Sequence, residues 1–303
     1  GPEFHGMGNA SRFRFMGVQY YRPPNPALED WDRDLAIIKE NGLALVRTWL
    51  YWSQVNREPN VWDYGDYDRF FDLAVKNKLA VLVQLIPEGT PQWLIARFPE
   101  AMLRNADGTL YVPRSEGMVA VGGYPGLSPD VPQVRDAMRE FFRRTANHYR
   151  ERSGLYGYDV WNEIMPYYTF NTCLYHPETQ AQFRNWLAHK YGQVQELNRA
   201  WGGCRYASFE QVEMTPRGAY ASQLDVHDFH RYWLKQHMIW RTNVIRQEDP
   251  KALVVSHAAG GLAQVTNAPH DCWDMGEAVD VWGTSDYEED FTRSSLLFNS
   301  IRD

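Results

Sequence analysis

The stretch LAVLVQLI, Leu79–Ile86, is a continuous apolar run of strand length. Runs of this kind are typical of strands buried on both faces, as the strands of parallel sheets are. An apolar stripe at helical spacing precedes it, formed by Tyr67, Phe70, Phe71 and Ala74, and this stripe predicts a helix that packs on the sheet. A helix followed by a buried strand is the repeating unit of α/β folds.

The same alternation runs along the chain. Strands are expected at residues 13–21, 43–50, 79–86, 157–164, 253–258 and 279–283, and helices near 31–38, 67–74, 134–145, 178–191, 225–247 and 294–302. A long loop is expected from about 87 to 130. Because no Gly-rich phosphate loop is present, so many units favour a (β/α)8 TIM barrel over a doubly wound sheet.

About six of the eight βα units of such a barrel are evident. We therefore expect residues 9–303 to be the N-terminal part of a barrel that continues in a longer protein. Residues 1–8, GPEFHGMG, are expected to be the remnant of an expression tag. No linker or internal repeat suggests a further domain boundary.

Composition excludes several classes of protein. Asp and Glu number 38 against 31 Lys and Arg, and the formal charge of −7 disfavours nucleic acid and anionic membranes as partners. The sequence contains no apolar run of membrane-spanning length, and no signal peptide follows Met7, so a cytoplasmic location is expected. The aromatic content of 15% exceeds ordinary core filling and suits a cleft that stacks on sugar rings.

The most informative local feature is Val160–Glu163, VWNE, at the end of the fourth expected strand. Active sites of barrels gather at the carboxyl ends of the strands, so Glu163 is placed for catalysis. A carboxyl group among aromatic side chains can stay protonated near neutral pH and act as a general acid. Asn162 beside it can bind a ring hydroxyl, whereas the alternative is an ordinary dipeptide in a loop.

Four other residues are candidate substrate contacts, each with a structural alternative. Arg47 follows a buried strand and could instead form a structural ion pair, and His257 ends the fifth strand and could be a core histidine. Trp52 and Trp161 could be sugar platforms or core residues. Glu88, after the third strand, is a candidate contact within the pocket.

Several separated segments resemble the glycoside hydrolase family 42 β-galactosidases, members of the retaining clan of (β/α)8 glycosidases. The segments occur in the family's order, and they are Gly17–Tyr21, Arg47 with Trp52 and Ser53, Thr90–Leu94, Asn105–Gly108, Asn162–Glu163, Lys190–Gly192 and Leu197–Gly202. The resemblance implies that Glu163 is the acid/base, that Asn162 binds a hydroxyl, and that Arg47 contacts the non-reducing sugar. Tyr287 resembles the clan's tyrosine near the nucleophile, with packing as its alternative role.

The resemblance implies a retaining exo-β-glycosidase, with β-galactosidase favoured. That mechanism needs a nucleophilic carboxylate about 5 Å from the acid/base. The clan carries it on the seventh strand, and no such residue is evident in this chain. The four-cysteine zinc cluster that some members of the family carry is absent, and no cofactor or catalytic metal is expected.

Three alternatives remain at this point. One is a clan relative acting on β-mannosides, β-glucosides or arabinosides, because Trp161 before Asn-Glu is common in those relatives. Another is a non-catalytic sugar-binding chain, and the third is an incomplete barrel fragment that needs a complementing piece. The expected partner is a small carbohydrate, and the resemblance implies a homotrimer.

Overall fold

The computed structural model describes residues 16–116, 119–164, 174–214, 219–259 and 272–285. In this part of the chain the main sheet has six parallel strands in the order β1-β2-β3-β8-β9-β10. These strands are β1 (Gly17–Gln19), β2 (Leu45–Tyr51), β3 (Ala80–Ile86), β8 (Leu155–Asp159), β9 (Val254–Ala259) and β10 (Val281–Ser285). All six expected strands are therefore confirmed, and they add to the sheet in chain order, as the strands of a (β/α)8 barrel do.

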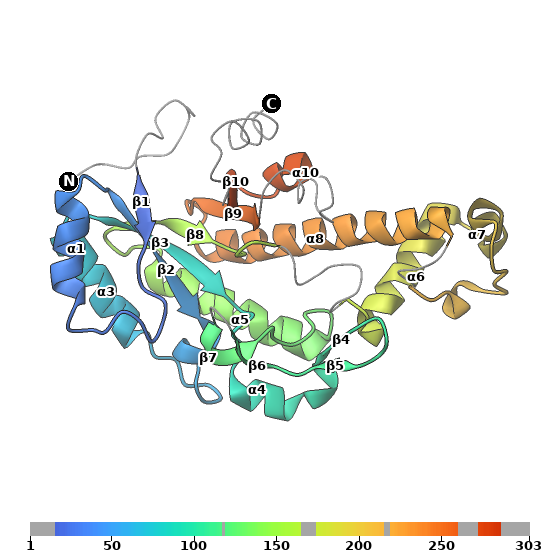
Figure 1. Cartoon of the computed structure of the whole chain (residues 1–303), viewed down its shortest axis with the longest axis horizontal. Coiled ribbons are helices and arrows are strands. Elements are labelled where there is room, and N and C mark those ends of the chain that lie inside the picture. Colours follow the sequence, from blue (N-terminus) through green and yellow to red (C-terminus); the bar gives the residue numbers. More distant parts are fainter. Residues whose placement is uncertain (1–15, 117–118, 165–173, 215–218, 260–271, 286–303) are drawn as a thin grey trace.

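Helices alternate with these strands, and those labelled α1, α3, α5 and α8 pack along the sheet (Figure 1). They are α1 (Trp31–Glu40), α2 (Trp52–Val55), α3 (Gly65–Lys76), α4 (Gln92–Arg97), α5 (Pro132–Tyr149), α6 (Pro177–Tyr191), α7 (Val194–Trp201), α8 (Tyr220–Glu248) and α10 (Cys272–Gly276), with short 3₁₀ turns at Pro99–Ala101 and Phe209–Gln211. The helix expected near 294–302 lies outside the described residues.

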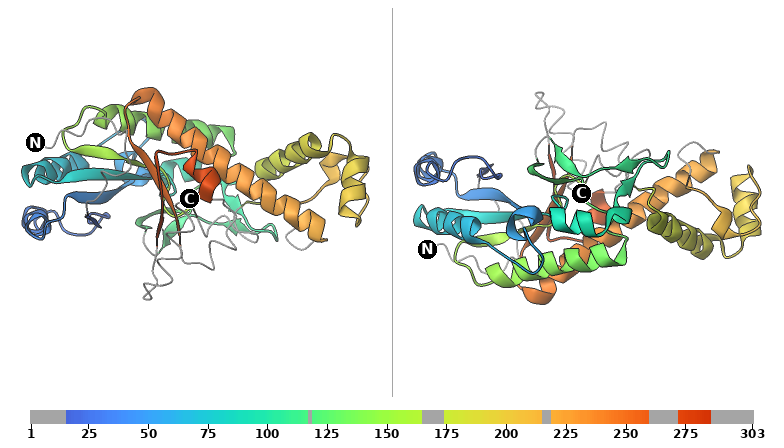
Figure 2. Two further views of the ribbon diagram at one scale, coloured as in Figure 1. Left: turned by 90° about the horizontal axis from the view of Figure 1, so that it is seen from above. Right: turned by 90° about the horizontal axis from the view of Figure 1, so that it is seen from below.

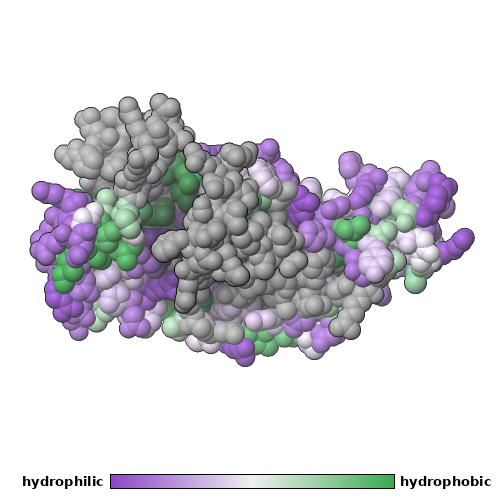
Figure 3. Space-filling model, turned by 45° about the horizontal axis from the view of Figure 1, so that its top comes forward, coloured by the Kyte–Doolittle hydropathy of each residue, from purple (hydrophilic) through white to green (hydrophobic). Residues whose placement is uncertain are grey.

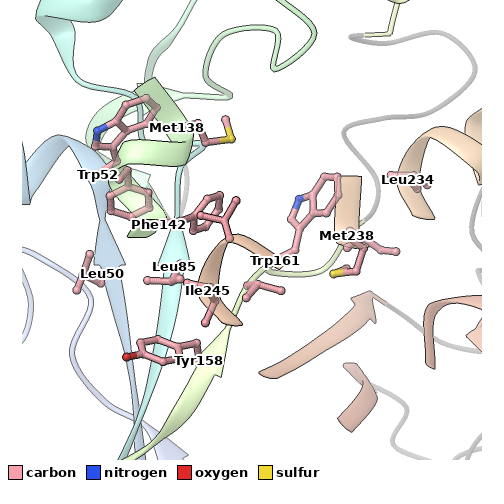
Figure 4. Packing of buried hydrophobic residues seen from close by; sticks show 14 of the residues in the cluster. Leu50, Trp52, Leu85, Met138, Phe142, Tyr158, Trp161, Leu234, Met238 and Ile245 are labelled. Atoms are coloured by element: carbon pink, nitrogen blue, oxygen red, sulfur yellow. The ribbon is translucent and has the colours of Figure 1, made fainter. Parts of the chain in front are cut away.

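Strand β3 shows why the sheet is buried on both faces. Val81, Val83 and Leu85 belong to the main core beneath the helices, and Ile86 belongs to a second cluster on the opposite face. The first group packs against helix residues such as Phe142 (Figure 4). The apolar run in the sequence therefore reflects two separate layers of packing.

The segment expected as one long loop contains regular structure. Two small antiparallel hairpins follow α4, formed by β4 (Leu103–Arg104) with β5 (Leu110–Tyr111) and by β6 (Arg114–Glu116) with β7 (Val119–Tyr124). Val119 and Tyr124 of β7 pack on Trp49, Tyr51 and Ile86 near the carboxyl ends of β2 and β3. The strands of these hairpins are short and show little alternation of polar and apolar residues, so the sequence did not predict them.

One glycine allows β7 to lie close to the loop that follows β3. Gly123 has φ +81°, and a Cβ atom there would fall 2.1 Å from the carbonyl oxygen of Thr90. No other residue type fits that space. The approach fixes the loop that carries Glu88 against the hairpin.

The helices α6, α7 and the first half of α8 form an arm that extends away from the sheet (Figures 1 and 2). Asp225 joins the three, because its carboxylate accepts hydrogen bonds from Lys190 Nζ at 2.6 Å, Tyr191 Oη at 2.7 Å and Trp201 Nε1 at 2.7 Å. Hydrophilic and hydrophobic residues are mixed over the visible surface of the arm (Figure 3). No helix in the described part of the chain is long and apolar enough to cross a membrane.

Candidate active site

Three strands of the sheet contribute polar side chains that meet on its inner face. Arg47 of β2 reaches across β3 and donates from Nη2 to Asp159 Oδ2 of β8 at 2.7 Å. The same nitrogen lies 3.2 Å from Asn162 Oδ1 and 3.3 Å from His257 Nε2. Arg47, Asn162 and His257, predicted separately from the sequence, are therefore neighbours.

Arg47 forms the ion pair that was one of its two predicted alternatives, and its role as a substrate contact stays a prediction. It forms an ion pair with Asp159, which is buried, yet 22% of the Arg47 side chain remains exposed. Burial tends to raise the pKa of Asp159, but the charge of Arg47 and the hydrogen bond from His257 lower it below its usual value. Asp159 is therefore ionised at neutral pH and holds the guanidinium in place.

His257 contacts the same ion pair through both ring nitrogens. Its Nε2 lies 3.3 Å from Arg47 Nη2, and its Nδ1 lies 3.2 Å from Asp159 Oδ2. Because His257 is largely buried, these contacts help to hold Arg47 and Asp159 in place.

Glu163 lies beyond the end of its strand and has an unusual backbone. The fourth strand was expected to continue to residue 164, but β8 ends at Asp159 because the chain then turns away from the parallel ladder. Glu163 has φ +41°, in the left-handed region that costs a residue other than glycine about 1–3 kcal/mol. Such strain persists only where the surroundings fix the backbone.

Hydrogen bonds on both sides of Glu163 supply that constraint. Val160 N donates to Val255 O at 3.0 Å, and Ile164 N donates to His257 O at 3.3 Å. Between them, Ser256 Oγ donates to the carbonyl oxygen of Trp161 at 2.9 Å. Strand β9 therefore holds the backbone around Asn162 and Glu163, both of which are partly exposed.

The two tryptophans require a correction. Trp52 is 1% exposed and stacks on Phe141 with ring centroids 5.6 Å apart. Trp161 is 2% exposed and packs between strand β8 and helix α8 (Figure 4). Neither ring has a free face for a sugar, so both are core residues, the second of the alternatives that the sequence left open.

Glu88 and Tyr287 complete the set of predicted residues. Glu88 lies after β3 and accepts at Oε1 from Arg241 Nη2 of α8 at 2.8 Å. Its role as a substrate contact stays a prediction. Tyr287 lies outside the described residues.

Sequence reasoning missed Asp159 and Arg241. Asp159 carries a signal that could have been found, because it is a charged residue inside an otherwise apolar and aromatic strand on the same face as the site. Arg241 carries none, since one arginine in a long helix is usually exposed. Within the described residues, no group of three or more His, Cys, Asp or Glu side chains is arranged to hold a metal ion.

A parallel barrel sheet with a carboxylate and an amide beyond the end of one strand, and with an arginine side chain that reaches the amide, has the arrangement of a barrel glycosidase. The sequence profile of glycoside hydrolase family 42, described as "Beta-galactosidase", matches residues 20–299. The chain belongs to this family.

Curated relatives and solved structures agree with that assignment. A "Beta-galactosidase" of Thermus thermophilus is 28% identical over 204 residues, which are 66% of this chain and 30% of the relative. "Beta-galactosidase Bga" of Halorubrum lacusprofundi is 24% identical over 287 residues, 92% of this chain and 39% of that protein. The chain spans less than half the length of these relatives.

Solved structures share the fold. The β-galactosidase structure from Halorubrum lacusprofundi has a TM-score of 0.78 at 23% identity, over 90% of this chain and 40% of that one. The β-galactosidase from a psychrophilic Marinomonas has a TM-score of 0.77 at 22% identity, over 90% of this chain and 41% of the other.

Proposed function

We propose that this chain provides the acid/base half of the active site of a retaining exo-β-galactosidase. The observation that carries the proposal is the position of Glu163, held next to Asn162 at the end of the fourth barrel strand, with Arg47 bound to Asn162. Family membership supports the substrate class. Glu163 protonates the glycosidic oxygen in the first step and deprotonates water in the second.

The other groups have supporting roles. Asn162 keeps an amide N–H pair for a sugar hydroxyl while its carbonyl oxygen accepts from Arg47. Arg47 is the partly exposed cation of the cluster and supplies donors to the hydroxyls of the non-reducing sugar. The nucleophile is not assigned. Assembly as a homotrimer and a cytoplasmic location also remain proposals, and light scattering tests the first.

Hydrolysis of aryl β-galactosides tests the function. Glu163→Gln removes the transferable proton of the first step, which kcat/KM reports. We therefore expect kcat/KM to fall about 10²-fold or more on phenyl β-galactoside and much less on 2,4-dinitrophenyl β-galactoside, whose leaving group needs no proton. Asp136→Asn, on the exposed face of α5, is the matched control. A loss below about tenfold on the phenyl substrate would contradict the assignment.

The remaining alternatives give different results. Faster turnover of aryl β-mannosides, β-glucosides or arabinosides than of galactosides would mean that the substrate carries that sugar instead of galactose. Saturable galactose binding without turnover, measured by calorimetry, would favour a non-catalytic role or a missing complementary piece.

A further inference from the structure

Helix α8 presents three buried side chains, one turn apart, toward Trp161. The ring centroids of Trp233 and His237 lie 6.2 and 6.5 Å from that of Trp161, and the guanidinium carbon of Arg241 lies 3.7 Å from it. Figure 4 shows Trp161 beside Met238, which is also on α8. The residue that precedes Asn162 and Glu163 is thus packed against a rigid element.

Arg241 also binds the backbone at this point. Its side chain is 1% exposed, its Nη1 donates to the carbonyl oxygen of Val160 at 3.0 Å, and its Nη2 donates to Glu88 Oε1 at 2.8 Å. A buried guanidinium is costly without a counterion, and Glu88 is the carboxylate that pairs with it. The ion pair therefore fixes Arg241 where its other nitrogen can hold Val160.

The backbone of residues 160–164 is consequently held from two sides. Strand β9 binds Val160 N, Trp161 O and Ile164 N, and Arg241 binds Val160 O. The strained conformation of Glu163 lies inside this segment. Because φ and ψ at Glu163 set the direction of its side chain, a shift of Val160 would displace the carboxyl group.

We propose that Arg241 and Glu88 are positioning residues that aim the carboxyl group of Glu163 at the glycosidic oxygen. The inference rests on the proposed acid/base role of Glu163. Arg241 acts through the Val160 carbonyl and the Trp161 ring, and Glu88 acts through Arg241. Neither residue needs to touch the substrate for this role.

Leaving-group dependence separates positioning from general damage. Arg241→Lys keeps the charge but cannot hold both acceptors in one plane while stacking on Trp161. We expect it to lower kcat/KM on phenyl β-galactoside about tenfold, with little effect on kcat/KM for 2,4-dinitrophenyl β-galactoside, because kcat/KM reports the first step and that leaving group needs no proton. Glu88→Gln is expected to act in the same direction. Arg246→Lys is the matched control, because Arg246 lies on the same helix and pairs with Asp280 at the surface.

A second measurement does not depend on turnover. Amide hydrogen exchange, followed by mass spectrometry on the folded 303-residue chain, should show faster exchange of the peptide containing residues 160–164 in Arg241→Lys and Glu88→Gln, and no change there in Arg246→Lys. Unchanged exchange in this peptide would overturn the inference. Equal losses of kcat/KM on both galactosides would also overturn it, because that pattern indicates general damage to the site.

The two measurements distinguish the failure of each proposal. If wild-type chain turns over neither galactoside, this polypeptide does not catalyse the reaction by itself, and the exchange experiment still decides whether Arg241 and Glu88 hold the segment. If wild-type chain is active and the variants behave as the Arg246→Lys control does, the function stands and the positioning role is wrong.

Discussion

Asp130 and Asp159 are both buried carboxylates, but their surroundings differ. Asp130, in the loop before α5, accepts hydrogen bonds from Thr179 Oγ1 at 2.5 Å, Trp233 Nε1 at 2.9 Å and His237 Nε2 at 3.1 Å. All three partners are at most 2% exposed. Both oxygens of Asp130 accept hydrogen bonds from buried donors, and its side chain is closed to solvent. The carboxylate therefore links the start of α5 to α6 and α8.

Asp159 is satisfied on one side only. Its Oδ2 binds Arg47 and His257, whereas Oδ1 has no hydrogen-bond partner in the described part of the chain. Its main partner, Arg47, keeps 22% of its side chain exposed. A buried carboxylate alone therefore does not mark a site, and the exposure of its partner is what separates Asp159, in the proposed site, from Asp130.

Removing the Asp130 carboxylate should have the largest effect on stability of the changes considered. Asp130→Ala leaves three buried donors without an acceptor, and we expect a loss of about 3–5 kcal/mol in the free energy of unfolding. Urea unfolding followed by circular dichroism measures it. A loss below about 1 kcal/mol would mean that solvent reaches this cluster.

The stability that Asp130 contributes should also depend on pH. Burial raises the pKa of Asp130, but hydrogen bonds from His237, Thr179 and Trp233 outweigh it and lower the pKa to about 2. Because this value is below that of the unfolded chain, the stabilisation is complete above about pH 4 and is lost as the pH falls towards 2.

Asp130→Asn removes that titration. We expect wild-type chain to be more stable than this variant by about 2 kcal/mol at pH 6, and the difference to shrink steadily below pH 4. Urea titrations at a series of pH values test it. A difference that stays constant down to pH 2 would show that Asp130 does not carry the effect.

The sequence predicted the six strands because buried parallel strands are visible as apolar runs. It predicted Asn162 and Glu163 as site residues because polar groups directly after such a run lie at one end of the sheet. Arg47 was predicted from the family resemblance, and it lies inside β2 instead of after the strand as expected. The roles proposed for these residues await experiment. The sequence also gave Trp52 and Trp161 equal weight as platforms and core, since burial depends on helices distant in the chain.

Asp159, Arg241 and Asp130 could not be paired from the sequence. Arg47 and Asp159 are 112 residues apart, and Arg241 and Glu88 are 153 apart. No local periodicity encodes contacts of that separation. The left-handed backbone of Glu163 was also hidden, because nothing in VWNE demands it.

Replacing Asp159 should affect sugar binding more than the stability of the fold. Asp159→Asn keeps the shape of the side chain but removes the charge opposite Arg47, and we expect a loss of about 1–2 kcal/mol in stability because Arg47 retains access to solvent. Galactose affinity, measured by calorimetry, should fall about tenfold as Arg47 loses its orientation. A stability loss larger than that of Asp130→Ala would reverse the comparison, and unchanged affinity would separate Arg47 from sugar binding.

The cluster around Asp225 in the arm contains one exposed and one buried partner. It tests whether the exposure of a partner determines how much its loss lowers stability. Lys190 is 38% exposed, whereas Asp225 also accepts from Tyr191 and from the buried Trp201. Asp225 is buried but keeps these two other donors when Lys190 is replaced, and Lys190 is accessible to solvent, so Lys190→Met should cost less than about 1 kcal/mol in urea unfolding. Trp201→Phe removes a buried donor and should cost more. If Lys190→Met proves the more destabilising of the two, charge rather than burial governs these clusters, and the exposure of Arg47 would no longer distinguish Asp159 from Asp130.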